Sequence, residues 1–283
     1  MRKLLVGLVG AGIQRSLSPA LHEEEARHHA LRLHYQLIDL DVDRVGAEAL
    51  PELVRAVRVI GFAGLNITYP CKQSIVPLLD ALSEEAQAIG AVNTVVRVGD
   101  RLVGHNTDGS GWSWGFRRAL PNADLLSVAL LGAGGAGSAC ADAVLRLGAR
   151  QLLIGDPDAS RARELAQRLN RQLPGDRAAA AADAETALKG ATGLIHATPV
   201  GMAKHPGMPL PERLLRGSMW VSEIVYVPLE TPLLKAARRI GCRTCDGGHM
   251  TVGQAIGAFK LFTGFDADAA RMDAHFRRLA SAS

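Results

Sequence analysis

The chain has 283 residues, of which 48% are hydrophobic and 21% are charged, and its formal net charge is +4. This composition is typical of a globular protein rather than a disordered one, and the length suits two domains. Basic residues are interspersed with acidic ones and no apolar stretch reaches 18 residues. We therefore expect neither nucleic-acid binding nor a membrane span.

The first twelve residues, MRKLLVGLVGAG, superficially resemble a signal peptide. The apolar stretch is short and broken by glycine, and no convincing cleavage site follows it, so we predict a first β-strand instead. The four cysteines include the pair Cys242 and Cys245 in a C-R-T-C sequence, which invites a zinc or redox interpretation. Further soft ligands at suitable spacing are missing, so we expect no metal and small core residues in a strand. Reduced thiols fit a cytoplasmic protein.

The first hundred residues alternate between predicted strands and helices. Strands are expected over LLVGLVG, HYQLIDL and GFAGLNIT, and helices over residues 19–31, 44–60 and 70–80, followed by a short amphipathic stretch, SEEAQAIG. The segments AVNTVVRVG and RLVGHN predict a hairpin around Gly99 and Asp100.

A second α/β series follows a connecting helix predicted over residues 109–120. Its expected strands are SVALL, QLLIG, GLIHAT, WVSEIVY and the CRTC segment, whereas AAAAAD is ambiguous between helix and strand. Residues 249–262 and 266–280 are predicted to be helical. The pattern indicates a two-domain α/β protein whose second domain is Rossmann-like and doubly wound.

The most informative segment is GAGGAG, at residues 132–137, between the SVALL strand and a predicted helix. Gly132, Gly134 and Gly137 satisfy the G-x-G-x-x-G pattern. Glycines permit a tight turn and let the backbone approach a pyrophosphate, whose charge is stabilised by the helix N-terminus. A turn that only packs a helix against a strand would also use glycines, but strand, helix and a following acid in the right order favour dinucleotide binding. The candidate cofactor-binding residues of the turn are Gly132, Ala133, Gly134, Gly135, Ala136 and Gly137.

The acid is Asp156, which lies 19 residues beyond Gly137, after the QLLIG strand. Its carboxylate is expected to accept hydrogen bonds from ribose hydroxyls and to repel a 2′-phosphate, which favours NAD over NADP. Arg161 is expected to stack on the adenine, although it could instead neutralise a phosphate. Asp156 followed by Pro157 could also simply end the strand.

Two segments of the first half carry polar residues at a predicted helix start. Ser16 and Ser18 precede the first helix, where two hydroxyls form a small anion site suited to a carboxylate, although Ser18 could simply cap the helix. Lys72 is expected in the first turn of the helix over residues 70–80. The helix dipole disfavours a cation there, which favours the neutral amine that acid–base chemistry requires. By position alone, a solvated surface lysine is the simpler interpretation.

Two further motifs, GAVNT and GHNTDG, place Asn93 and Asp108 beside apolar strands. Each could serve a turn or a helix cap. An aspartate held near Lys72, however, would orient the ammonium group for proton transfer. The combination is more informative than any single residue.

With these motifs the chain resembles the shikimate dehydrogenase family over essentially its full length. The matching segments, in chain order, are SLSP, GLNITYPCK, GAVNT, GHNTDG, GAGGAG, IHATPVGM, VYVPLETPLL and GGHMTVGQA. Within the family, GLNITYPCKQ, Asp156, and GGHM with AFKLFTG look most like the NAD-dependent quinate/shikimate dehydrogenases. NADP-dependent biosynthetic members typically carry Asn-Arg-Thr after the second strand of the cofactor domain.

The resemblance implies a role for each matching position. Lys72 and Asp108 would be the catalytic pair, and Ser16 and Ser18 would hold a substrate carboxylate. The ring hydroxyls would be bound by Thr68, Asn93, Asp108 and Gln254. Tyr226 would border the substrate, and the nicotinamide half of the cofactor would contact Thr198, Pro199, Val200, Val225 and Gly247.

The implied protein is a cytoplasmic, NAD-dependent oxidoreductase with a carboxylated cyclitol as substrate. It would interconvert shikimate and 3-dehydroshikimate, or quinate and 3-dehydroquinate, by hydride transfer. Residues 1–108, completed by helices in 249–283, would form the substrate domain, and residues 109–248 the NAD domain. NADP is the less favoured cofactor, and the family's range of states allows a homodimer.

Three departures from the family pattern leave the choice between shikimate and quinate open. Glu223 replaces a more usual aspartate, His249 lies in a glycine-rich turn, and Ser18 stands where quinate-using relatives often have threonine. Another cyclic polyol acid, such as an aminoshikimate, is one alternative. A catalytically silent dinucleotide sensor is another, but it would need neither Lys72 nor Asp108. A metal-dependent hydrolase lacks a ligand cluster.

Overall fold

The computed structural model describes residues 2–42 and 44–282, and the chain divides into two compact units. The first unit comprises the residues up to Thr107 and those from Gln254 onward, and the second is Asp108–Gly253. Within the described residues, none of the helices is both long enough and apolar enough to cross a membrane.

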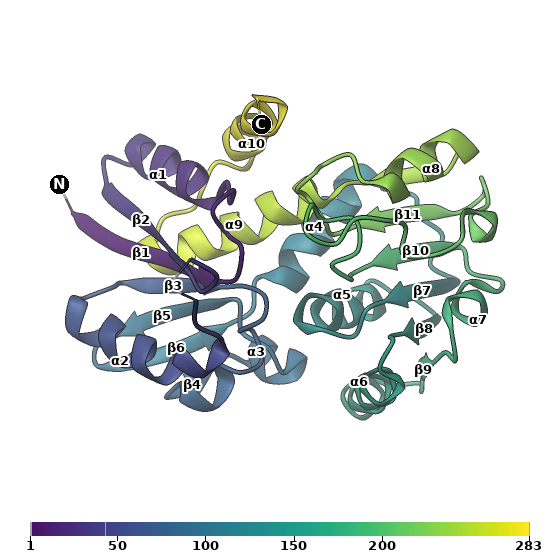
Figure 1. The fold of residues 1–283 in the computed structure, drawn as a ribbon, viewed down its shortest axis with the longest axis horizontal. Helices are drawn as coiled ribbons and strands as arrows, with labels where there is room; N and C mark the ends of the chain where they lie inside the picture. Colours follow the sequence, from purple (N-terminus) through teal and green to yellow (C-terminus); the bar gives the residue numbers. More distant parts are fainter. Residues whose placement is uncertain (1, 43, 283) are drawn as a thin grey trace. The chain divides into compact units, whose positions relative to one another are not determined.

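The first unit is built on a six-stranded mixed sheet with the strand order β2-β1-β3-β5-β6-β4 (Figure 1). All neighbouring strands are parallel except that β5 is antiparallel to β3 and β6. The strands are β1 (Lys3–Gly10), β2 (Arg32–Asp39), β3 (Gly64–Ile67), β4 (Ala81–Leu82), β5 (Thr94–Val98) and β6 (Arg101–His105). The helices are α1 (Ser18–His28), η1 (Ala47–Ala49), α2 (Leu50–Ile60), η2 (Val76–Leu78), α3 (Glu84–Ile89), α10 (Ala269–Ala282) and the second half of α9 (Gly247–Thr263).

Strand β1 shows why this sheet is covered on both faces. Val6 and Leu8 pack with α1 and α9 in one apolar cluster, whereas Val9 packs with α2 and β3 in another. A strand buried on both faces reads as a nearly continuous apolar run, as LLVGLVG does. Each such side chain contributes about 1.5–3 kcal/mol on burial, so the run holds β1 at an interior position of its sheet.

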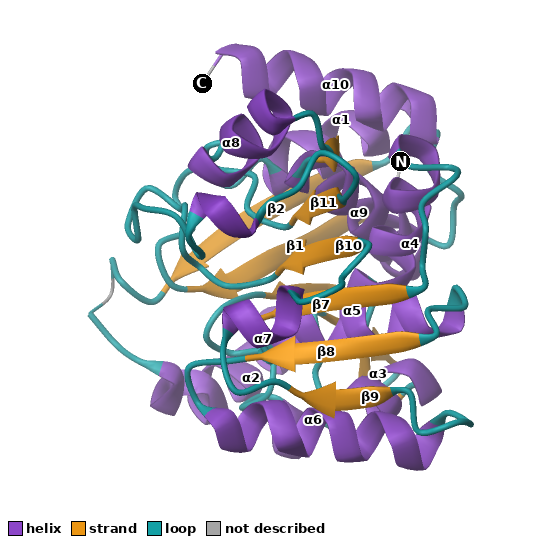
Figure 2. Ribbon diagram, turned by 90° about the vertical axis from the view of Figure 1, so that its right-hand side faces the viewer, coloured by secondary structure: helices purple, strands orange, loops and turns teal. Residues whose placement is uncertain are grey.

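The second unit contains a six-stranded sheet, all parallel, with the order β12-β11-β10-β7-β8-β9. Figure 2 shows β11, β10, β7, β8 and β9 side by side in this order. The strands are β7 (Ser127–Leu131), β8 (Gln151–Gly155), β9 (Ala178–Ala180), β10 (Gly193–His196), β11 (Trp220–Glu223) and β12 (Arg243–Cys245). The helices are α4 (Asp108–Ala119), α5 (Gly135–Arg146), α6 (Ala159–Gln172), α7 (Ala184–Leu188), η3 (Glu212–Leu214), α8 (Pro232–Ile240) and the start of α9.

Helices cover both faces of this second sheet. Val128 and Leu130 of β7 pack with α4, α5 and α6, whereas Ala129 and Leu131 pack with α7 and α8. This is the doubly wound, Rossmann-like arrangement that the alternation of strands and helices predicts, so the predicted α/β fold class is confirmed.

The predicted helix over residues 70–80 is wrong. Residues 69–75 form consecutive turns, followed only by the short η2. Pro77 explains the outcome, because inside an α-helix its ring would clash with the carbonyl four residues earlier and remove a hydrogen bond. The dipole argument for Lys72 fails with the helix.

The structure also shows the secondary structure of two other segments. The ambiguous AAAAAD run supplies β9, which pairs with β8. The helix expected from residue 44 begins only at Leu50, after η1, with Pro51 in its first turn. Cys242 and Cys245 are buried free thiols at β12, as predicted for small core residues.

Candidate active site

The glycine-rich turn joins β7 to α5, and each of its three glycines has a separate structural reason. Gly132 has a φ of +105°, and a Cβ there would lie 2.5 Å from the carbonyl oxygen of Ala197. A Cβ on Gly137 would lie 2.0 Å from the Gly132 oxygen. At Gly134, the N-cap of α5, a Cβ would meet only the Arg161 guanidinium, at 3.5 Å. The tip of the turn thus leaves backbone accessible at a helix N-terminus, which fits a dinucleotide pyrophosphate.

Asp156 follows β8 and closes this turn from the side. Its Oδ2 accepts a hydrogen bond from Ala133 N at 2.7 Å, and its Oδ1 accepts from Asp158 N at 2.9 Å. The carboxylate is therefore fixed at the carboxyl edge of the sheet, with remaining lone pairs on both oxygens. The two sequence interpretations coincide, since Asp156 both starts a turn and presents a carboxylate beside the glycines. Its contact with ribose hydroxyls stays a prediction.

The loops after β10 and β11 contain the other predicted cofactor residues. Thr198, Pro199 and Val200 follow β10, and the Cγ2 atom of Thr198 lies 3.1 Å from where a Cβ of Gly132 would be. Val225 and Gly247 are also brought together, since a Cβ on Gly247 would lie 2.3 Å from the Val225 oxygen. The carboxyl ends of neighbouring parallel strands are where ligands bind in open α/β sheets.

In the first unit, Ser16 and Ser18 lie at the start of α1. The N-cap is Leu17 and not Ser18, and Ser18 N donates a hydrogen bond to Ser16 Oγ at 3.3 Å. Ser18 is itself buried. The capping alternative for Ser18 is therefore wrong, whereas Ser16 satisfies a helix N–H and places its hydroxyl at the positive end of α1.

Thr68 and Lys72 lie in the turns that follow β3. Gly10 allows Thr68 to pack closely, because a Cβ on Gly10 would lie 2.3 Å from the Thr68 methyl group. The carbonyl of Lys72 accepts from Val92 N at 2.8 Å, which ties the lysine backbone to the GAVNT segment. The adjacent Cys71 is fully buried, and burial raises the pKa of its thiol to about 11, so it is unsuited to be a nucleophile.

Asn93 is more embedded than its predicted role suggests. Its Oδ1 accepts from Thr107 N at 2.8 Å, its Nδ2 donates to Thr107 Oγ1 at 2.9 Å, and only 2% of the residue is exposed. Thr107 Oγ1 also lies 3.1 Å from the carbonyl oxygen of Gln254. Asn93 and Gln254 therefore converge on Thr107, the residue that immediately precedes Asp108 at the start of α4. Sequence reasoning missed Thr107, although the GHNTDG motif contains it.

A further buried polar group was missed at the ends of β10 and β11. His196 and Glu223 lie opposite each other in the parallel register and share a hydrogen bond of 2.8 Å. Glu223 stood out in the sequence only as a departure from the family pattern. Two polar residues ending adjacent buried strands were the available signal.

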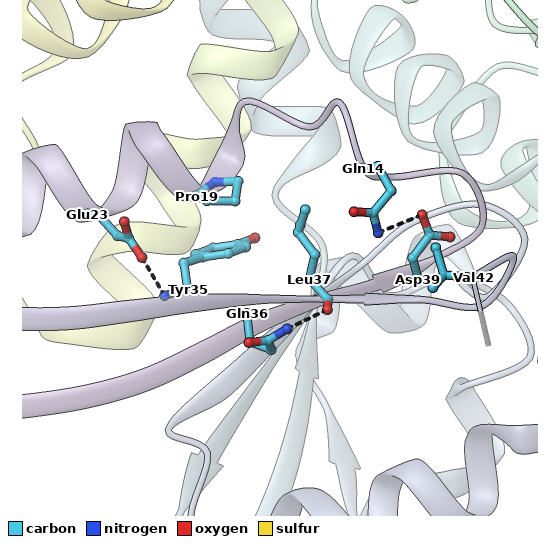
Figure 3. A pocket seen from close by; sticks show the side chains of 8 residues that line it. All are labelled: Gln14, Pro19, Glu23, Tyr35, Gln36, Leu37, Asp39 and Val42. Atoms are coloured by element: carbon cyan, nitrogen blue, oxygen red, sulfur yellow. Dashed lines mark hydrogen bonds between the residues drawn. The ribbon is translucent and has the colours of Figure 1, made fainter.

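The hollow drawn in Figure 3 has none of these residues in its lining, although Ser16 and Ser18 lie between its lining residues Gln14 and Pro19 in the chain. It has a volume of about 640 Å³ and is lined along β2, the edge strand, by Gln14, Pro19, Glu23, Tyr35, Gln36, Leu37, Asp39 and Val42. Glu23 accepts from Tyr35 N at 2.8 Å, and Gln36 Nε2 donates to Leu37 O, so side chains satisfy part of the strand edge. None of these lining residues is a predicted site residue. Within residues 2–42 and 44–282, no cluster of three metal-ligating side chains occurs.

Comparisons with known proteins agree with this architecture. Residues 8–95 match the family described as "Shikimate dehydrogenase substrate binding domain", and residues 127–224 match "NADP oxidoreductase coenzyme F420-dependent". The shikimate dehydrogenase (NADP(+)) of Streptomyces avermitilis is 55% identical, over 98% of this chain and 96% of its own length. The quinate/shikimate dehydrogenase (NAD(+)) of Corynebacterium efficiens is 45% identical, over 98% of each chain.

A solved structure is similar over the same extent. The quinate dehydrogenase from Corynebacterium glutamicum in complex with NAD is 42% identical, with a TM-score of 0.89, and the match covers 98% of this chain and 100% of that one. Fold and site together define a two-domain oxidoreductase with a Rossmann-like NAD(P)-binding sheet and a separate substrate domain.

The chain belongs to the shikimate dehydrogenase family. The relationship confirms the family resemblance seen in the motifs. It does not confirm the closer resemblance to NAD-dependent members, because the relative at 55% identity is named for NADP and the one at 45% for NAD.

Proposed function

We propose that this protein is a dehydrogenase of shikimate, quinate or both, with Lys72 as the acid–base residue and Asp108 as its partner. The carrying observation is that one chain, similar to such enzymes over 98% of its length, contains Lys72 after β3, Asp108 at the start of α4 and the complete glycine-rich turn. A dinucleotide sensor without catalysis would need only the last of these. Residues 1–108 with 249–283 would bind the substrate, and residues 109–248 the dinucleotide.

The dinucleotide, when bound, supplies hydride exchange at its nicotinamide ring. It would be held by the turn at residues 132–137, by Asp156 and Arg161, and by the loops containing Thr198, Pro199, Val200 and Val225, with Gly247 beside them. Hydride exchange does not move the proton of the substrate hydroxyl, so that proton must be transferred by side chains of the protein.

Lys72 Nζ would take the proton of the reacting ring hydroxyl during oxidation and return it during reduction. Proton transfer by a positioned side chain is worth about 10²–10⁴ in rate. Asp108, as a carboxylate, would orient the ammonium form and accept a hydrogen bond from a substrate hydroxyl. Asn93 and Gln254 support this role, because both contact Thr107 next to Asp108.

Ser16 and Ser18 would bind the carboxylate of a cyclic polyol acid at the N-terminus of α1. The hydroxyl of Ser16 already lies beside the first helical N–H groups, which favour an anion. Thr68 and Tyr226 would complete the contacts to the ring. Because shikimate and quinate differ at the carbon that bears the carboxylate, residues beside these serines would decide between them.

For the cofactor we propose a preference for NAD. Asp156 is fixed beside the glycine turn by two backbone N–H groups, and a carboxylate there repels a 2′-phosphate. Arg161, whose guanidinium lies beside Gly134, is the residue that would favour NADP instead. The two relatives divide in the same way, one named for NADP and one for NAD.

One kinetic matrix tests this proposal. Shikimate and quinate are each oxidised with NAD and with NADP, and kcat/KM is measured for the four combinations. Turnover with at least one acid, and a higher kcat/KM with NAD, are the expected results. Activity with neither acid would refute the reaction, and a higher kcat/KM with NADP would refute the cofactor preference alone.

A further inference from the structure

A buried polar network joins the ends of β10 and β11 in the second unit. His196 ends β10, Glu223 ends β11, and they are 0% and 1% exposed. The imidazole Nδ1 lies 2.8 Å from Glu223 Oε1, and its Nε2 lies 2.5 Å from Thr198 Oγ1. The histidine thus connects a carboxylate on one strand to a hydroxyl in the loop after the other.

Glu223 extends the network into the loop after β11. Its Oε1 also accepts from Ile224 N at 2.8 Å and from Val225 N at 3.0 Å. Its Oε2 accepts from the hydroxyl of Thr231, which in turn caps α8 by accepting from Leu234 N. One carboxylate therefore fixes the conformation of residues 224–225 and the start of a helix.

The other arm fixes the loop after β10. Thr198 Oγ1, held by His196, accepts from Val200 N at 3.3 Å. The same loop packs on the glycine turn, since the Ala197 oxygen lies 2.5 Å from where a Cβ of Gly132 would be. The Cγ2 atom of Thr198 lies 3.1 Å from the same position, so a rotation of the Thr198 side chain would disturb both the loop and the turn.

Packing alone does not call for this network. Apolar residues of similar volume often stabilise a buried site as well as an ion pair or better, because burial of charged and polar groups carries a desolvation penalty. What the network adds is directional: apart from the bond between His196 and Glu223, every hydrogen bond ends on a backbone or side-chain group of residues 198–200, 224–225 or the start of α8. Both loops leave the carboxyl edge of the sheet, where ligands bind in this fold.

We propose that His196 and Glu223 are positioning residues, which hold the loops at 197–200 and 224–226 in the conformation that receives the nicotinamide half of the dinucleotide. This inference rests on the proposed function. The two residues act through Thr198 and the backbone of residues 224–225, and the adenine half is bound elsewhere, at the glycine turn and Asp156.

The test compares two ligands by isothermal titration calorimetry. One is whichever dinucleotide the wild type binds more tightly. The other is its adenine half, ADP-ribose or 2′-phospho-ADP-ribose. His196→Asn keeps a donor at the position of Nδ1 but is too short to reach Thr198, and Thr198→Val removes the hydroxyl from the other side. Each substitution is expected to lower the affinity for the dinucleotide about tenfold, because small displacements of positioning groups have large effects. The affinity for the adenine half should change less than about twofold, since the glycine turn that is proposed to hold it stays intact.

The double variant separates a shared pathway from two independent effects. If His196 acts through Thr198, His196→Asn/Thr198→Val binds the dinucleotide no more weakly than Thr198→Val alone. Additive losses overturn the proposal. So does an equal loss for both ligands. Should His196→Asn fail to fold, Thr198→Val and Glu223→Gln must each show the selective loss.

Ser222→Ala is the matched control. Ser222 is buried next to Glu223 on β11 but accepts a hydrogen bond from Trp112 Nε1 at 3.0 Å on the opposite face of the sheet. It should lower thermal stability and leave dinucleotide affinity unchanged, and a selective loss of dinucleotide in this variant would overturn the proposal. Calorimetry needs no turnover, so a wild type that binds the dinucleotide but oxidises neither acid refutes the proposed function and leaves this inference standing.

Discussion

The two units contain a similar Gly-Ala-Gly turn, followed by different structures. In each, a buried strand runs into Gly-Ala-Gly, at Gly10–Gly12 and at Gly132–Gly134, and an aspartate from the neighbouring strand closes the turn. Asp39 accepts from Gly12 N at 2.8 Å, and Asp156 accepts from Ala133 N at 2.7 Å. In each unit a threonine in the segment after another neighbouring strand lies beside the first glycine of the turn. Thr68, after β3, lies beside Gly10, and Thr198, after β10, lies beside Gly132.

The difference lies in where the next helix starts. In the second unit α5 begins at Gly135, directly after the turn, so its N-terminus faces whatever lies over the glycines. In the first unit α1 begins only at Ser18, eight residues after Gly10. The intervening loop carries Gln14 and Ser16, and Asp39 is engaged by Gly12 N, Ile13 N, Gln14 Nε2 and Asp41 N. Two features therefore distinguish the turn that is proposed to bind a pyrophosphate from the structural turn: the position of the helix, and the third glycine, Gly137, whose counterpart in the first unit is Arg15.

The strongest test of this division is Lys72→Ala. If Lys72 of the first unit is the acid–base group and the dinucleotide binds to the second unit, kcat should fall about 10³-fold, since that is a typical worth of a positioned acid–base group. Dinucleotide affinity should stay unchanged. Steady-state kinetics and calorimetry measure the two effects, and Lys189→Ala, at an exposed site in the second unit, is the control. Near-normal turnover of Lys72→Ala would exclude the lysine from catalysis.

Gly137→Ala and Arg15→Ala compare the third position of the G-x-G-x-x-G pattern, which is Gly137 in the second unit and is occupied by Arg15 in the first. The new Cβ at residue 137 would lie 2.0 Å from the Gly132 oxygen, so the turn and the start of α5 must separate. We expect dinucleotide affinity to fall about 100-fold, because such a shift would displace the backbone groups that are proposed to hold the pyrophosphate. Arg15→Ala should leave that affinity unchanged. Equal affinities of both variants for the dinucleotide would show that the turn at residues 132–137 is not the binding site.

Much of this architecture was predictable from the sequence because its signals are local. The strand at SVALL, the glycine turn and the helix after it follow from an apolar run and three glycines, and the hairpin around Gly99 follows from turn residues between alternating strands. The helix predicted over residues 70–80 does not form because Pro77 interrupts an otherwise helical pattern.

What the sequence did not reveal depends on pairing between strands. The contact between His196 and Glu223 exists because β10 and β11 are parallel neighbours and these two residues pair in their register. The sequence around either residue does not show which residue of the other strand it will face. The same holds for Asn93, whose carboxamide is directed at Thr107 fourteen residues away. Motif resemblance marked the residues but not the hydrogen bonds that they make.

Asp39→Asn and Asp156→Asn compare the two closing carboxylates. Burial alone would raise the pKa of Asp39, but hydrogen bonds from Gln14, Gly12, Asp41 and Ile13 outweigh it and lower that pKa below its usual value. An amide there turns an acceptor into a donor facing buried N–H groups, so Asp39→Asn should cost about 2 kcal/mol of unfolding free energy, with the dinucleotide preference unchanged. Urea denaturation measures the loss.

Asp156→Asn should act on ligand choice instead. Removing the charge should lower the affinity for NAD about tenfold, because the ribose hydroxyls lose a charged acceptor. The affinity for NADP should fall much less, because repulsion of its 2′-phosphate disappears at the same time. Calorimetry with both dinucleotides measures the change. Equal losses for NAD and NADP would remove the reason for assigning cofactor preference to Asp156.

The smallest expected effect comes from a second contrast, between the buried histidines of the two units. Both ring nitrogens of His196 are hydrogen-bonded, whereas neither nitrogen of His22 has a partner among residues 2–42 and 44–282. His22 packs against the rings of Tyr35, Phe259 and Phe262, with centroids 5.1, 6.2 and 5.9 Å away. Burial lowers the pKa of His22 to about 4, from an ordinary value of 6.5, against an opposing effect of Glu25.

Because the folded chain binds this proton less tightly than the unfolded chain does, the stability that His22 supports is present above pH 6.5 and is lost as the pH falls toward 4. Between pH 7 and 5.5 the loss amounts to about 1 kcal/mol. His22→Phe keeps an aromatic ring and removes the titration, so its free energy of unfolding should fall less than that of the wild type over the same interval. Urea denaturation at both pH values gives the difference. Parallel pH profiles would show that the pKa of His22 is the same in the folded and unfolded chain, so that burial does not lower it.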